Sequence, residues 1–538
     1  MAVFATAFVV LSVAILSTAA DDTENIEGAA GDNFSISYDS DAYSLVYKVT
    51  SESPAIAEVS GFTGTLPSVL SIPSSVNYDS TDYDITSIGD DVFSKCTGLT
   101  TVTMPNVETI GYFAFSECTG LTTVNMPSVT FISECAFYKC TELTTVTMPN
   151  VETVEPYAFD RCTKLTSMII DESNPNYSSD GGVLFNHDRT VLMMYPAAKG
   201  NYTVPGSVIS IWNYAFVNCT GLTSVNMLNV TNIGEFAFYG CSGLTAIDIP
   251  NVTSVGNSAF VYCAGLTTVT MPNVEIIEYG AFDSCTGLMT VTMPNVETIR
   301  GFAFNKCTKL TSMIIDESNP NYSSDGGVLF NHDRTVLITY PAVKGNYVVP
   351  DSVTSLLDYA FYGCTGLISI TMLNVTNIGD LAFAYCTGLT TITVPNVASI
   401  RGDAFQGCTG LKVAAIPFAT DIEDDSFQGT KIIEYTGNDI VSVTAYVTDT
   451  GESMIRIIVN DGMTVSGVTT ETSGTSVTPC GEDTYEVIFG SEDTVRISVT
   501  TGPKGNDDDG NIMLFIAIGA VVAVIALAAV YFLMIRKP

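Results

Sequence analysis

Apolar residues recur along most of this chain in one fixed pattern of 22 positions. In residues 99–120, LTTVTMPNVETIGYFAFSECTG, they are Leu99, Val102, Met104, Val107, Ile110, Ala114, Phe115 and Cys118. This spacing fits neither a long amphipathic helix nor one continuous strand. It predicts a short strand ended by Pro105, a second extended piece, and a tight return through AFSEC. The pattern indicates one turn of a β-rich solenoid.

One turn of this kind is too small to fold alone. The apolar surface it buries does not offset the conformational entropy of ordering 22 residues, so such units are stable only in stacks. A fixed internal period therefore predicts one elongated array instead of several compact domains. The regular turns begin at Leu99, Leu121, Leu143, Leu222, Leu244, Leu266, Leu288, Leu367 and Leu389, and a degraded turn begins at Leu411.

Two turns, those that begin at Leu165 and Leu310, are 57 residues long, which is 22 residues plus an insert of 35. Both read LTSMIIDESNPNYSSDGGVLFNHDRTVL without a difference, 145 positions apart. A block of five turns therefore looks copied as a unit. Within the insert, GVLF and TVLMMYP flank the tip at 186–189, which predicts a hairpin packed on the side of the solenoid.

The flanking segments have a different pattern. Residues 21–70 contain FSISYDS and YSLVYKVT, and residues 433–500 contain VSVTAYV, MIRIIV, TYEVIF and TVRISV, all of which alternate apolar with polar residues. These segments predict an N-terminal cap of strands that covers the first turn, and a small β-sandwich after the array. Residues 501–511, TGPKGNDDDGN, read as an acidic linker.

The two ends of the chain predict secretion and a membrane anchor. An apolar run at 3–16 is followed by small residues and then by Asp21, which is typical of a signal peptide, although the start carries no Lys or Arg. Residues 512–535 are uncharged and long enough to cross a bilayer as a helix. Arg536 and Lys537 follow this helix, so the repeats are expected outside the cell and the membrane is the plasma membrane. The predicted organisation is a signal peptide at 1–20, a β cap at 21–70, a solenoid at 71–432, a membrane-proximal β-sandwich-like domain at 433–500, a linker at 501–511, one transmembrane helix at 512–535 and a cytoplasmic tail at 536–538.

Net charge narrows the class of partner. The chain has 57 acidic and 20 basic residues, a formal net charge of -37. This charge repels phosphate backbones at long range, so nucleic acid is not expected as a partner.

The repeat L-T-x-V-x-M-P-N-V-x-x-I-x-x-x-A-F-x-x-C-T-G resembles the BspA-type leucine-rich repeat of microbial cell-surface proteins. The insert motifs NPNYSSDGGVLFN and YPAAKGNY resemble a segment found in the same family. The unit is one residue shorter than the usual turn of that family, so the local curvature is expected to differ. The resemblance implies a β-rich leucine-rich-repeat solenoid that acts as a surface receptor or adhesin for host proteins, neighbouring cells or matrix, without enzymatic activity.

Twelve of the fourteen cysteines recur at one repeat position. A secreted chain with an even cysteine count permits disulfides, and stacked turns bring adjacent cysteines near bonding range. Side chains in register, however, point in parallel, and each cysteine follows a buried Ala-Phe pair. We therefore favour reduced thiols that fill the core. The remaining two, Cys135 and Cys480, are outside this series.

Motifs for catalysis or cofactor binding are missing from the sequence. The only histidines, His187 and His332, fall on the two identical hairpin tips and read as solvated turn residues. The sequence has no G-x-S-x-G, P-loop or H-E-x-x-H motif. We therefore expect no catalytic residue, no metal site and no cofactor.

Exposed positions of the first strand form the candidate binding face. They would line up as two rows of small polar side chains, a broad surface for a protein or a glycan, although such residues also simply favour exposed strands. The candidate residues are Thr101, Thr103, Thr123, Asn125, Thr145, Thr147, Ser224, Asn226, Thr268, Thr270, Thr290, Thr292, Ser369, Thr371, Thr391 and Thr393.

Eight N-x-S/T sequons are candidate glycosylation sites on an extracellular surface. Asn is the repeat consensus after the strand and Thr is abundant, so some of these sequons arise by coincidence. The sequons begin at Asn33, Asn176, Asn201, Asn218, Asn229, Asn251, Asn321 and Asn374.

Together these features predict a non-catalytic, single-pass surface protein whose solenoid recognises an extracellular protein or glycan. Two alternatives remain from the sequence. One is a structural component of the cell envelope that associates laterally with itself, and the weaker one is a glycan-active enzyme.

Overall fold

The structure, a computed structural model, describes residues 30–503 apart from 40–41, 418–419, 424, 428, 449, 461–462, 471, 473–474, 482–483 and 490–493. The predicted signal peptide, transmembrane helix and cytoplasmic tail lie outside these residues, and so does most of the linker. In the part of the chain that is described, no helix is long and apolar enough to span a bilayer.

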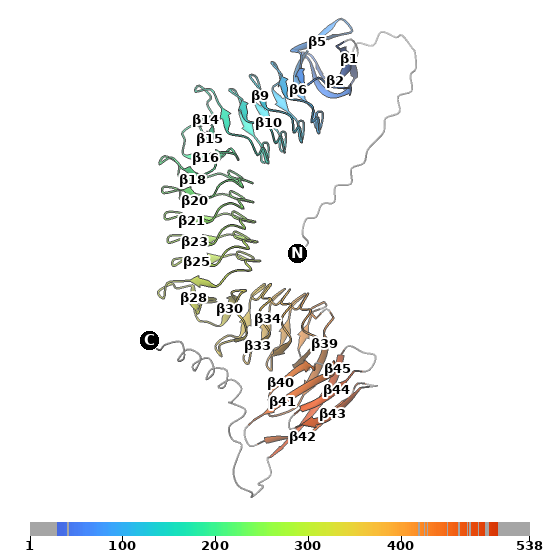
Figure 1. Cartoon of the computed structure of the whole chain (residues 1–538), viewed down its shortest axis with the longest axis vertical. Helices are drawn as coiled ribbons and strands as arrows, with labels where there is room; N and C mark the ends of the chain where they lie inside the picture. The colour runs from blue at the N-terminus through green and yellow to red at the C-terminus, as the bar shows by residue number, and fades with distance from the viewer. Residues whose placement is uncertain are drawn as a thin grey trace, which may run out of the picture.

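The chain forms a β-solenoid of about 16 turns with a repeat of about 22 residues. Figure 1 shows the turns stacked into an arc, with the N-terminal strands at one tip and the sheets of the C-terminal strands at the other. Each regular turn has three sides, which are a first strand, a second strand and a return loop, defined as residues 111–118 in the turn that begins at Leu99. The sequence prediction of a leucine-rich-repeat solenoid is confirmed at this level.

The first strand of each turn comes from the L-T-x-V-x-M segment. Its central apolar side chain, such as Val102 or Val269, is buried, and the strand ends where the P-N turn begins. Successive first strands pair in parallel. The first strands are β4 (Val69–Ser71), β7 (Thr101–Thr103), β9 (Thr123–Asn125), β11 (Thr145–Thr147), β13 (Ser167–Ile169), β17 (Tyr202–Thr203), β19 (Val225–Asn226), β21 (Ala246–Asp248), β23 (Thr268–Thr270), β25 (Thr290–Thr292), β27 (Ser312–Ile314), β31 (Tyr347–Val348), β33 (Ser369–Thr371) and β35 (Thr391–Thr393).

The second strand of each turn comes from the V-x-x-I segment and also pairs in parallel with its neighbours. The second strands are β8 (Thr109–Ile110), β10 (Phe131–Ile132), β12 (Thr153–Val154), β16 (Val191–Met194), β18 (Ser210–Ile211), β20 (Asn232–Ile233), β22 (Ser254–Val255), β24 (Ile276–Ile277), β26 (Thr298–Ile299), β30 (Val336–Thr339), β32 (Ser355–Leu356), β34 (Asn377–Ile378), β36 (Ser399–Ile400) and β38 (Asp421–Ile422).

The N-terminal strands extend the sheet of second strands and cover its first edge. The order in this sheet is β1-β2-β3-β6-β8-β10-β12, with β5 paired to β6. An exposed edge of unpaired backbone groups invites association with other chains, so covering it protects the array. These strands are β1 (Asn33–Tyr38), β2 (Tyr43–Glu52), β3 (Ala55–Gly64), β5 (Ser75–Tyr78) and β6 (Thr81–Ile88).

The return loops hold the centre of the core. The phenylalanine of each A-F pair stacks on the phenylalanine of the next turn, as in Phe238, Phe260 and Phe282, whose ring centroids lie 5.0 Å apart at both steps. Offset stacking of this kind adds to the apolar burial of each ring. The loops are also joined by backbone bonds, such as Phe260 N–H to the Ala281 carbonyl at 2.7 Å.

The cysteine series lies beneath these stacked rings as free thiols. None of the fourteen cysteines forms a disulfide, and eleven of the twelve in the series are buried. Each buried Sγ–H lies within reach of a carbonyl one turn earlier, as in Cys263 to Phe238 at 3.1 Å. Burial raises the pKa of Cys118, which keeps that thiol protonated. In the last turn Thr430 takes the cysteine position and donates to the Leu411 carbonyl at 2.8 Å.

The hairpin predicted around the tip at 186–189 forms, because β15 (Val183–Asn186) pairs antiparallel with β16, but the prediction that it packs on the side of the solenoid is wrong. Both inserts enter the core. In the first insert all side chains of the strand segment 183–185 are buried. Leu184 packs in the cluster of the preceding turns, whereas Val183 and Phe185 pack in the cluster of the following turns. Successive side chains of a strand point to opposite faces, so this strand packs against one block of the array on each face. Each insert thus makes two consecutive hairpins, β14–β15 and β15–β16 in the first insert and β28–β29 and β29–β30 in the second. The added strands are β14 (Tyr177–Asp180), β15 (Val183–Asn186), β28 (Tyr322–Asp325) and β29 (Val328–Asn331).

Each 57-residue unit makes two turns. In the first insert, β13 and β16 belong to one turn, and β17 and β18 belong to the next, because β16 pairs with β18 and β17 pairs with β19. The return loop between β16 and β17 is short, and its Tyr195 replaces phenylalanine in the ring stack, 4.8 Å from Phe216.

Two four-stranded sheets follow the array, in the orders β37-β39-β45-β42 and β40-β41-β44-β43, and they are separate from the sheet of first strands that ends at β35. Their inward side chains, such as Val443, Ile455 and Val495, form one cluster. The expected boundary at 432 and 433 falls inside β39. These strands are β37 (Val413–Pro417), β39 (Lys431–Thr436), β40 (Ile440–Val447), β41 (Ser453–Val459), β42 (Met463–Thr470), β43 (Ser476–Gly481), β44 (Thr484–Ile488) and β45 (Thr494–Pro503).

Replacing one stacked ring should loosen the array around it. Phe260 is fully buried, so we expect Phe260→Ala to lower the local free energy of unfolding by about 3–5 kcal/mol. Tyr262, two residues away and 52% exposed, is the matched control, and Tyr262→Ala should change it by less than about 0.5 kcal/mol. Hydrogen exchange of residues 230–300 measures both, because repeat arrays open locally. Equal protection in the two variants would contradict a central role for the ring stack.

The tight turn of the first hairpin offers a second test. Gly182 has φ +84°, and a Cβ there would lie 2.7 Å from Ser167 Cα. Gly181 also has positive φ, but a Cβ there meets nothing within 4 Å. We expect Gly182→Ala to lower stability by roughly 1–3 kcal/mol more than Gly181→Ala in thermal melts. Similar melting temperatures for the two variants would show that the hairpin does not pack tightly on β13.

Candidate functional site

The candidate threonine rows form as expected on the first strands. Thr101, Thr123 and Thr145 are paired in register, and so are Thr268 and Thr290. Seven of the candidates are exposed, namely Thr103, Thr123, Asn125, Ser224, Asn226, Thr268 and Thr270. Eight are half-buried, namely Thr101, Thr145, Thr147, Thr290, Thr292, Ser369, Thr371 and Thr391.

Three features make the threonine rows smaller and less continuous than the sequence predicted. Each insert ends the sheet of first strands, so the rows are divided into separate sheets and do not form one continuous platform. Ile169 and Ile314 also replace the polar residue of the second row. Thr393 is buried, and the prediction that it is displayed is wrong, because strand β40 covers it and Thr444 shares a hydrogen bond with it at 2.8 Å.

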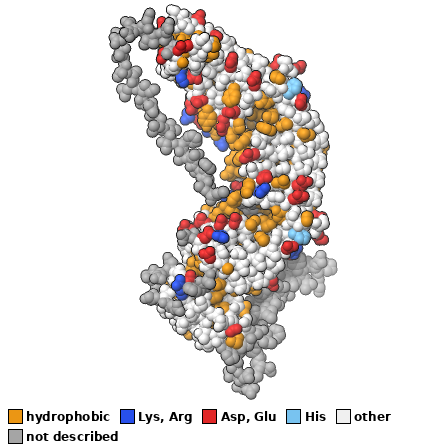
Figure 2. Space-filling view, turned by 180° about the vertical axis from the view of Figure 1, so that it is seen from behind, with side chains coloured by type: hydrophobic (Ala, Val, Ile, Leu, Met, Phe, Trp, Pro, Cys, Tyr) orange, Lys and Arg blue, Asp and Glu red, His pale blue; other side chains and the backbone are white. Residues whose placement is uncertain are grey.

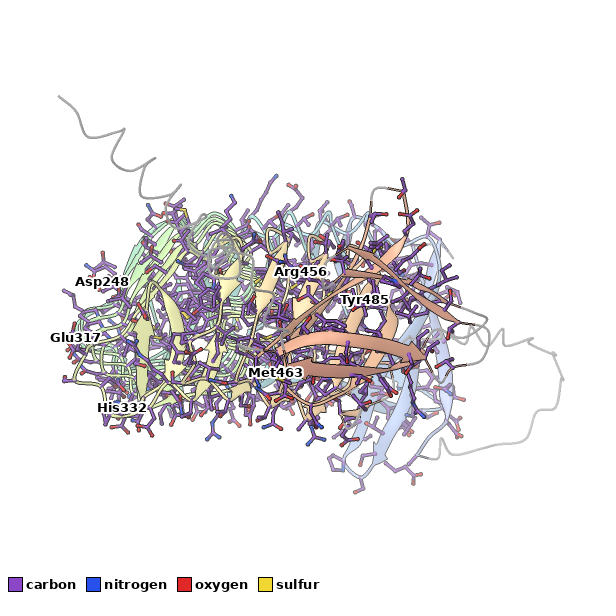
Figure 3. All side chains as sticks on the ribbon, turned by 90° about the horizontal axis from the view of Figure 1, so that it is seen from below. Asp248, Glu317, His332, Arg456, Met463 and Tyr485 are labelled. Carbon is purple, nitrogen blue, oxygen red and sulfur yellow. The ribbon has the colours of Figure 1, made fainter. Side chains whose placement is uncertain are left out.

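Figure 3 looks along the stack of turns and labels Asp248 and His332 on one side of it. Asp248, at the second-row position of β21, and His332, at the second hairpin, both lie at the outer side of the arc. The return loops form the opposite side of each turn, which we call the inner face.

Several sequon asparagines have structural roles. The asparagine of the P-N turn donates from Nδ2 to a carbonyl of the preceding turn, as Asn251 does to Leu228 at 2.6 Å. Asn229 and Asn374 make the same bond. Asn218 donates to Asp160, and Asn201 Oδ1 accepts from the Thr223 backbone N–H. The other three sequons, Asn33, Asn176 and Asn321, lie at exposed positions.

The histidines stabilise their hairpins. His187 Nδ1 lies 2.8 Å from the Asn174 carbonyl, and His332 Nδ1 lies 2.8 Å from the Asn319 carbonyl, so Nδ1–H is the donor in both. No group of three or more His, Cys, Asp or Glu side chains that could hold a metal ion occurs among the residues that the structure describes.

The inner face carries exposed aromatic side chains that the sequence pattern did not single out. The residue before each Ala-Phe pair has positive φ, and it is bulky in several turns, as in Phe113, Tyr157 and Tyr359. A left-handed conformation costs about 1–2 kcal/mol for a residue with a Cβ, so it persists only where the packing of the turn imposes it. These three side chains are half-buried, whereas Tyr262 and Tyr385, which also have positive φ in their return loops, are exposed. Figure 2 shows a band of hydrophobic side chains along the inner side of the arc, with basic side chains beside it.

These rings contact one another from turn to turn. Tyr214 and Phe236 have centroids 5.2 Å apart, and Tyr239 and Tyr262 have centroids 5.4 Å apart. Basic side chains lie over the same row, as Arg300 does over Tyr279 at 5.8 Å. An exposed, connected aromatic surface is typical of an interaction site.

Each insert interrupts the inner face with a cleft. The short return loop before β17 leaves a gap between the return loops on either side, and the gap is a cavity of about 310 Å³. Its aromatic walls include Tyr157, Tyr195, Trp212 and Tyr214. The second insert makes an equivalent cavity of about 220 Å³, lined by Phe302, Tyr340, Tyr359 and Tyr362 among others. We call these the first cleft and the second cleft.

Burial raises the pKa of acidic and tyrosine side chains in the clefts. Burial raises the pKa of Asp160 in the first cleft, although the bond from Asn218 and the nearby Arg161 oppose the shift. In the second cleft, burial together with Tyr385, Tyr359 and Asp283 raises the pKa of Tyr362 to about 12. The tyrosine hydroxyls of the clefts are therefore neutral donors at physiological pH.

The repeat segments match the sequence profile described as BspA type Leucine rich repeat region, in 6 copies, over residues 74–180, 199–311 and 345–447. These ranges make up more than half of the chain. They leave out most of the residues of the two inserts.

Solved structures with similar folds include three bacterial proteins. A leucine rich cell surface protein from Faecalibacterium prausnitzii is 24% identical, with 76% of this chain and 97% of that chain covered and a TM-score of 0.38. A leucine-rich repeat protein from Eubacterium ventriosum is 22% identical, with 70% and 95% covered and a TM-score of 0.41. The pneumococcal vaccine antigen PcpA is 17% identical, with 65% and 98% covered and a TM-score of 0.39. A search of curated protein sequences finds no match.

The raised pKa of Asp160 predicts how the first cleft responds to pH. A carboxyl group with a raised folded-state pKa stabilises the protein most below its unfolded pKa, and this contribution is lost as pH rises through the folded value. Asp160→Asn keeps an Oδ1 acceptor for Asn218 without the charge. We therefore expect this variant to melt at a higher temperature than the parent at pH 7 and at the same temperature near pH 3.

Asp171, in the 57-residue unit that begins at Leu165, is a control whose pKa shift has the opposite sign. Its pKa is lowered by the side-chain and backbone hydrogen bonds from Ser173. Asp171→Asn should therefore lower the melting temperature at pH 7. A lower melting temperature for Asp160→Asn at pH 7 would mean that the ion pair of Asp160 with Arg161 outweighs the cost of burying the charge.

Proposed function

Because the chain belongs to the BspA-type leucine-rich repeat family, we propose that it is a non-catalytic recognition protein of the cell surface that binds extracellular proteins or glycans through its solenoid. The proposal gives the return loops, which form the inner face, the main role in binding. The threonine rows of the outer side have a lesser role.

The observation that carries this proposal is the set of exposed aromatic side chains in the return loops. Trp212, Tyr262, Tyr279 and Tyr385 are between 46% and 52% exposed, whereas the phenylalanines stacked beneath them are buried. Exposed rings on fixed backbone keep little conformational freedom to lose on binding, so they suit recognition. The threonine rows offer small side chains divided among several sheets, which give less contact area.

Variation from turn to turn supports recognition of a specific partner. The core positions of the return loop are nearly constant, but the position before Ala-Phe is Phe113 in one turn, Cys135 in the next and Tyr157 in the third. Constant buried residues preserve the stacking, and variable exposed residues change what the surface presents. A surface of this kind can become specific without altering the fold.

We further propose that the solenoid stands outside the cell on a membrane anchor. The apolar segment 512–535 would be the transmembrane helix, residues 1–20 the signal peptide, and the paired C-terminal sheets a small β-sandwich next to the membrane. Strand β37 lies in the last turn of the array, whose second strand β38 pairs with β36, so this unit would hold the inner face at a fixed orientation.

Binding of the soluble ectodomain, residues 21–505, tests the proposal. We expect it to bind cells, matrix proteins or glycans above background, and Tyr262→Ser with Tyr385→Ser to weaken this binding at least about tenfold. Thr268→Ala with Thr270→Ala on the outer row is the matched control and should bind like the parent. Absence of any partner, with ordered self-association instead, would overturn the proposal in favour of a structural envelope protein.

A further inference from the structure

The two clefts allow a direct comparison, because one block of the chain is a copy of the other. The hairpins that support them have identical sequences over residues 165–192 and 310–337. The residues that line the clefts have nevertheless diverged at several positions. In the second block Arg300 replaces Glu155, Asn305 replaces Asp160, and Tyr362 replaces Val217. The two hairpins thus have the same sequence, whereas the residues that line the two clefts differ.

The first cleft is bridged by its own side chains. The rings of Tyr157 and Tyr214, from the return loops on its two sides, lie with centroids 4.6 Å apart. Asn218 Nδ2 donates to Asp160 Oδ1 at 2.8 Å across the same gap. The main polar groups of this cleft therefore satisfy each other.

The second cleft lacks the polar half of this bridge. Phe302 and Tyr359 still meet edge to face at 4.4 Å, but Gly363 stands where the first cleft has Asn218. Asn305 takes the place of Asp160, and its buried Oδ1 has no hydrogen-bond partner among the described residues. A buried acceptor without a donor destabilises the folded chain, and a bound donor would remove this penalty.

The groups around Asn305 select the class of donor. Tyr359 and Tyr362 offer ring faces 5.6 Å apart, Lys306 Nζ lies 6.0 Å over the Tyr362 ring, and Asp358 also lines the cavity. Ring faces flanked by an amide, an ammonium and a carboxylate match a sugar, which has C–H faces and hydroxyl edges. A basic peptide side chain would meet Lys306 and Arg300, and polyphosphates are repelled by the net charge of -37.

We propose that the second cleft is a carbohydrate subsite, in which one sugar unit of a glycan stacks on Tyr362 and donates a hydroxyl hydrogen bond to Asn305 Oδ1. This assignment rests on the proposed recognition function and names its ligand class and position. The first cleft is the larger cavity, but its Asp160 acceptor already receives the hydrogen bond from Asn218, so the proposal does not extend to it.

The first cleft supplies the design of the test. Asn305→Asp combined with Gly363→Asn copies the Asp160–Asn218 bridge into the second cleft. Asparagine tolerates the φ of +68° at Gly363, and a Cβ there meets no atom within 4 Å. We expect this double variant of the ectodomain to lose binding to hexasaccharides of glucose, mannose, xylose or glucuronic acid by at least tenfold, measured by calorimetry on whichever of the four binds the parent.

Asn257→Asp is the matched control. Asn257 Oδ1 is also buried without a partner among the described residues, but it lines neither cleft, so this variant should bind like the parent. Tyr362→Ser removes the stacking ring from a half-buried position and should lose binding as the double variant does. Because it leaves Asn305 and Gly363 unchanged, it tests the subsite even if the double variant misfolds.

A fluorescence readout separates the two clefts. The chain has a single tryptophan, Trp212, and it lines the first cleft. Sugar bound in the second cleft should leave Trp212 emission unchanged, whereas a change would place the ligand in the first cleft and overturn the assignment. An ectodomain that binds cells or matrix but none of the four sugars would contradict the carbohydrate subsite and leave the proposed recognition function intact. An ectodomain that binds nothing would overturn the proposed function as well.

Discussion

Stacking of one turn on the next is the interaction on which this structure depends. No single turn has enough apolar surface to fold, so each ring, such as Phe260, is buried only because the neighbouring turns supply Phe238 and Phe282. Backbone ladders on all three sides fix the same register. This repetition leaves the outward side chains free to vary, because they add little to the core.

The inserts show how the array tolerates a change of period. A strand inserted across the core presents Leu184 to one block and Phe185 to the other, so both blocks stay covered. Tyr195 then continues the ring stack through a shortened return loop. The shorter loop cannot fill the space between its neighbours, and the clefts follow from that difference in length. Two copies of one insert thus produce two sites whose chemistry can diverge.

The sequence predicted the core better than the surface. Buried positions repeat every 22 residues, and the rows of Thr101 and Thr123 followed from the alternation of a strand. Thr393 was misjudged because β40, some 50 positions later in the chain, folds over it. The aromatic inner face was missed because its exposed rings, such as Tyr262 and Tyr385, occupy left-handed positions, a backbone conformation that a hydrophobic pattern does not encode.

The sequence by itself determined the repeat unit, its stacking and the identity of the buried side chains, since periodic apolar residues have only one way to share a core. The tertiary structure alone decided that the hairpins enter the core, that the return loops form an aromatic inner face, and that Asn305 lacks the donor that Asp160 has. These features arise from contacts between residues far apart in the chain. A local sequence pattern does not encode such contacts, because the burial of a surface residue depends on which distant segment of the chain packs over it.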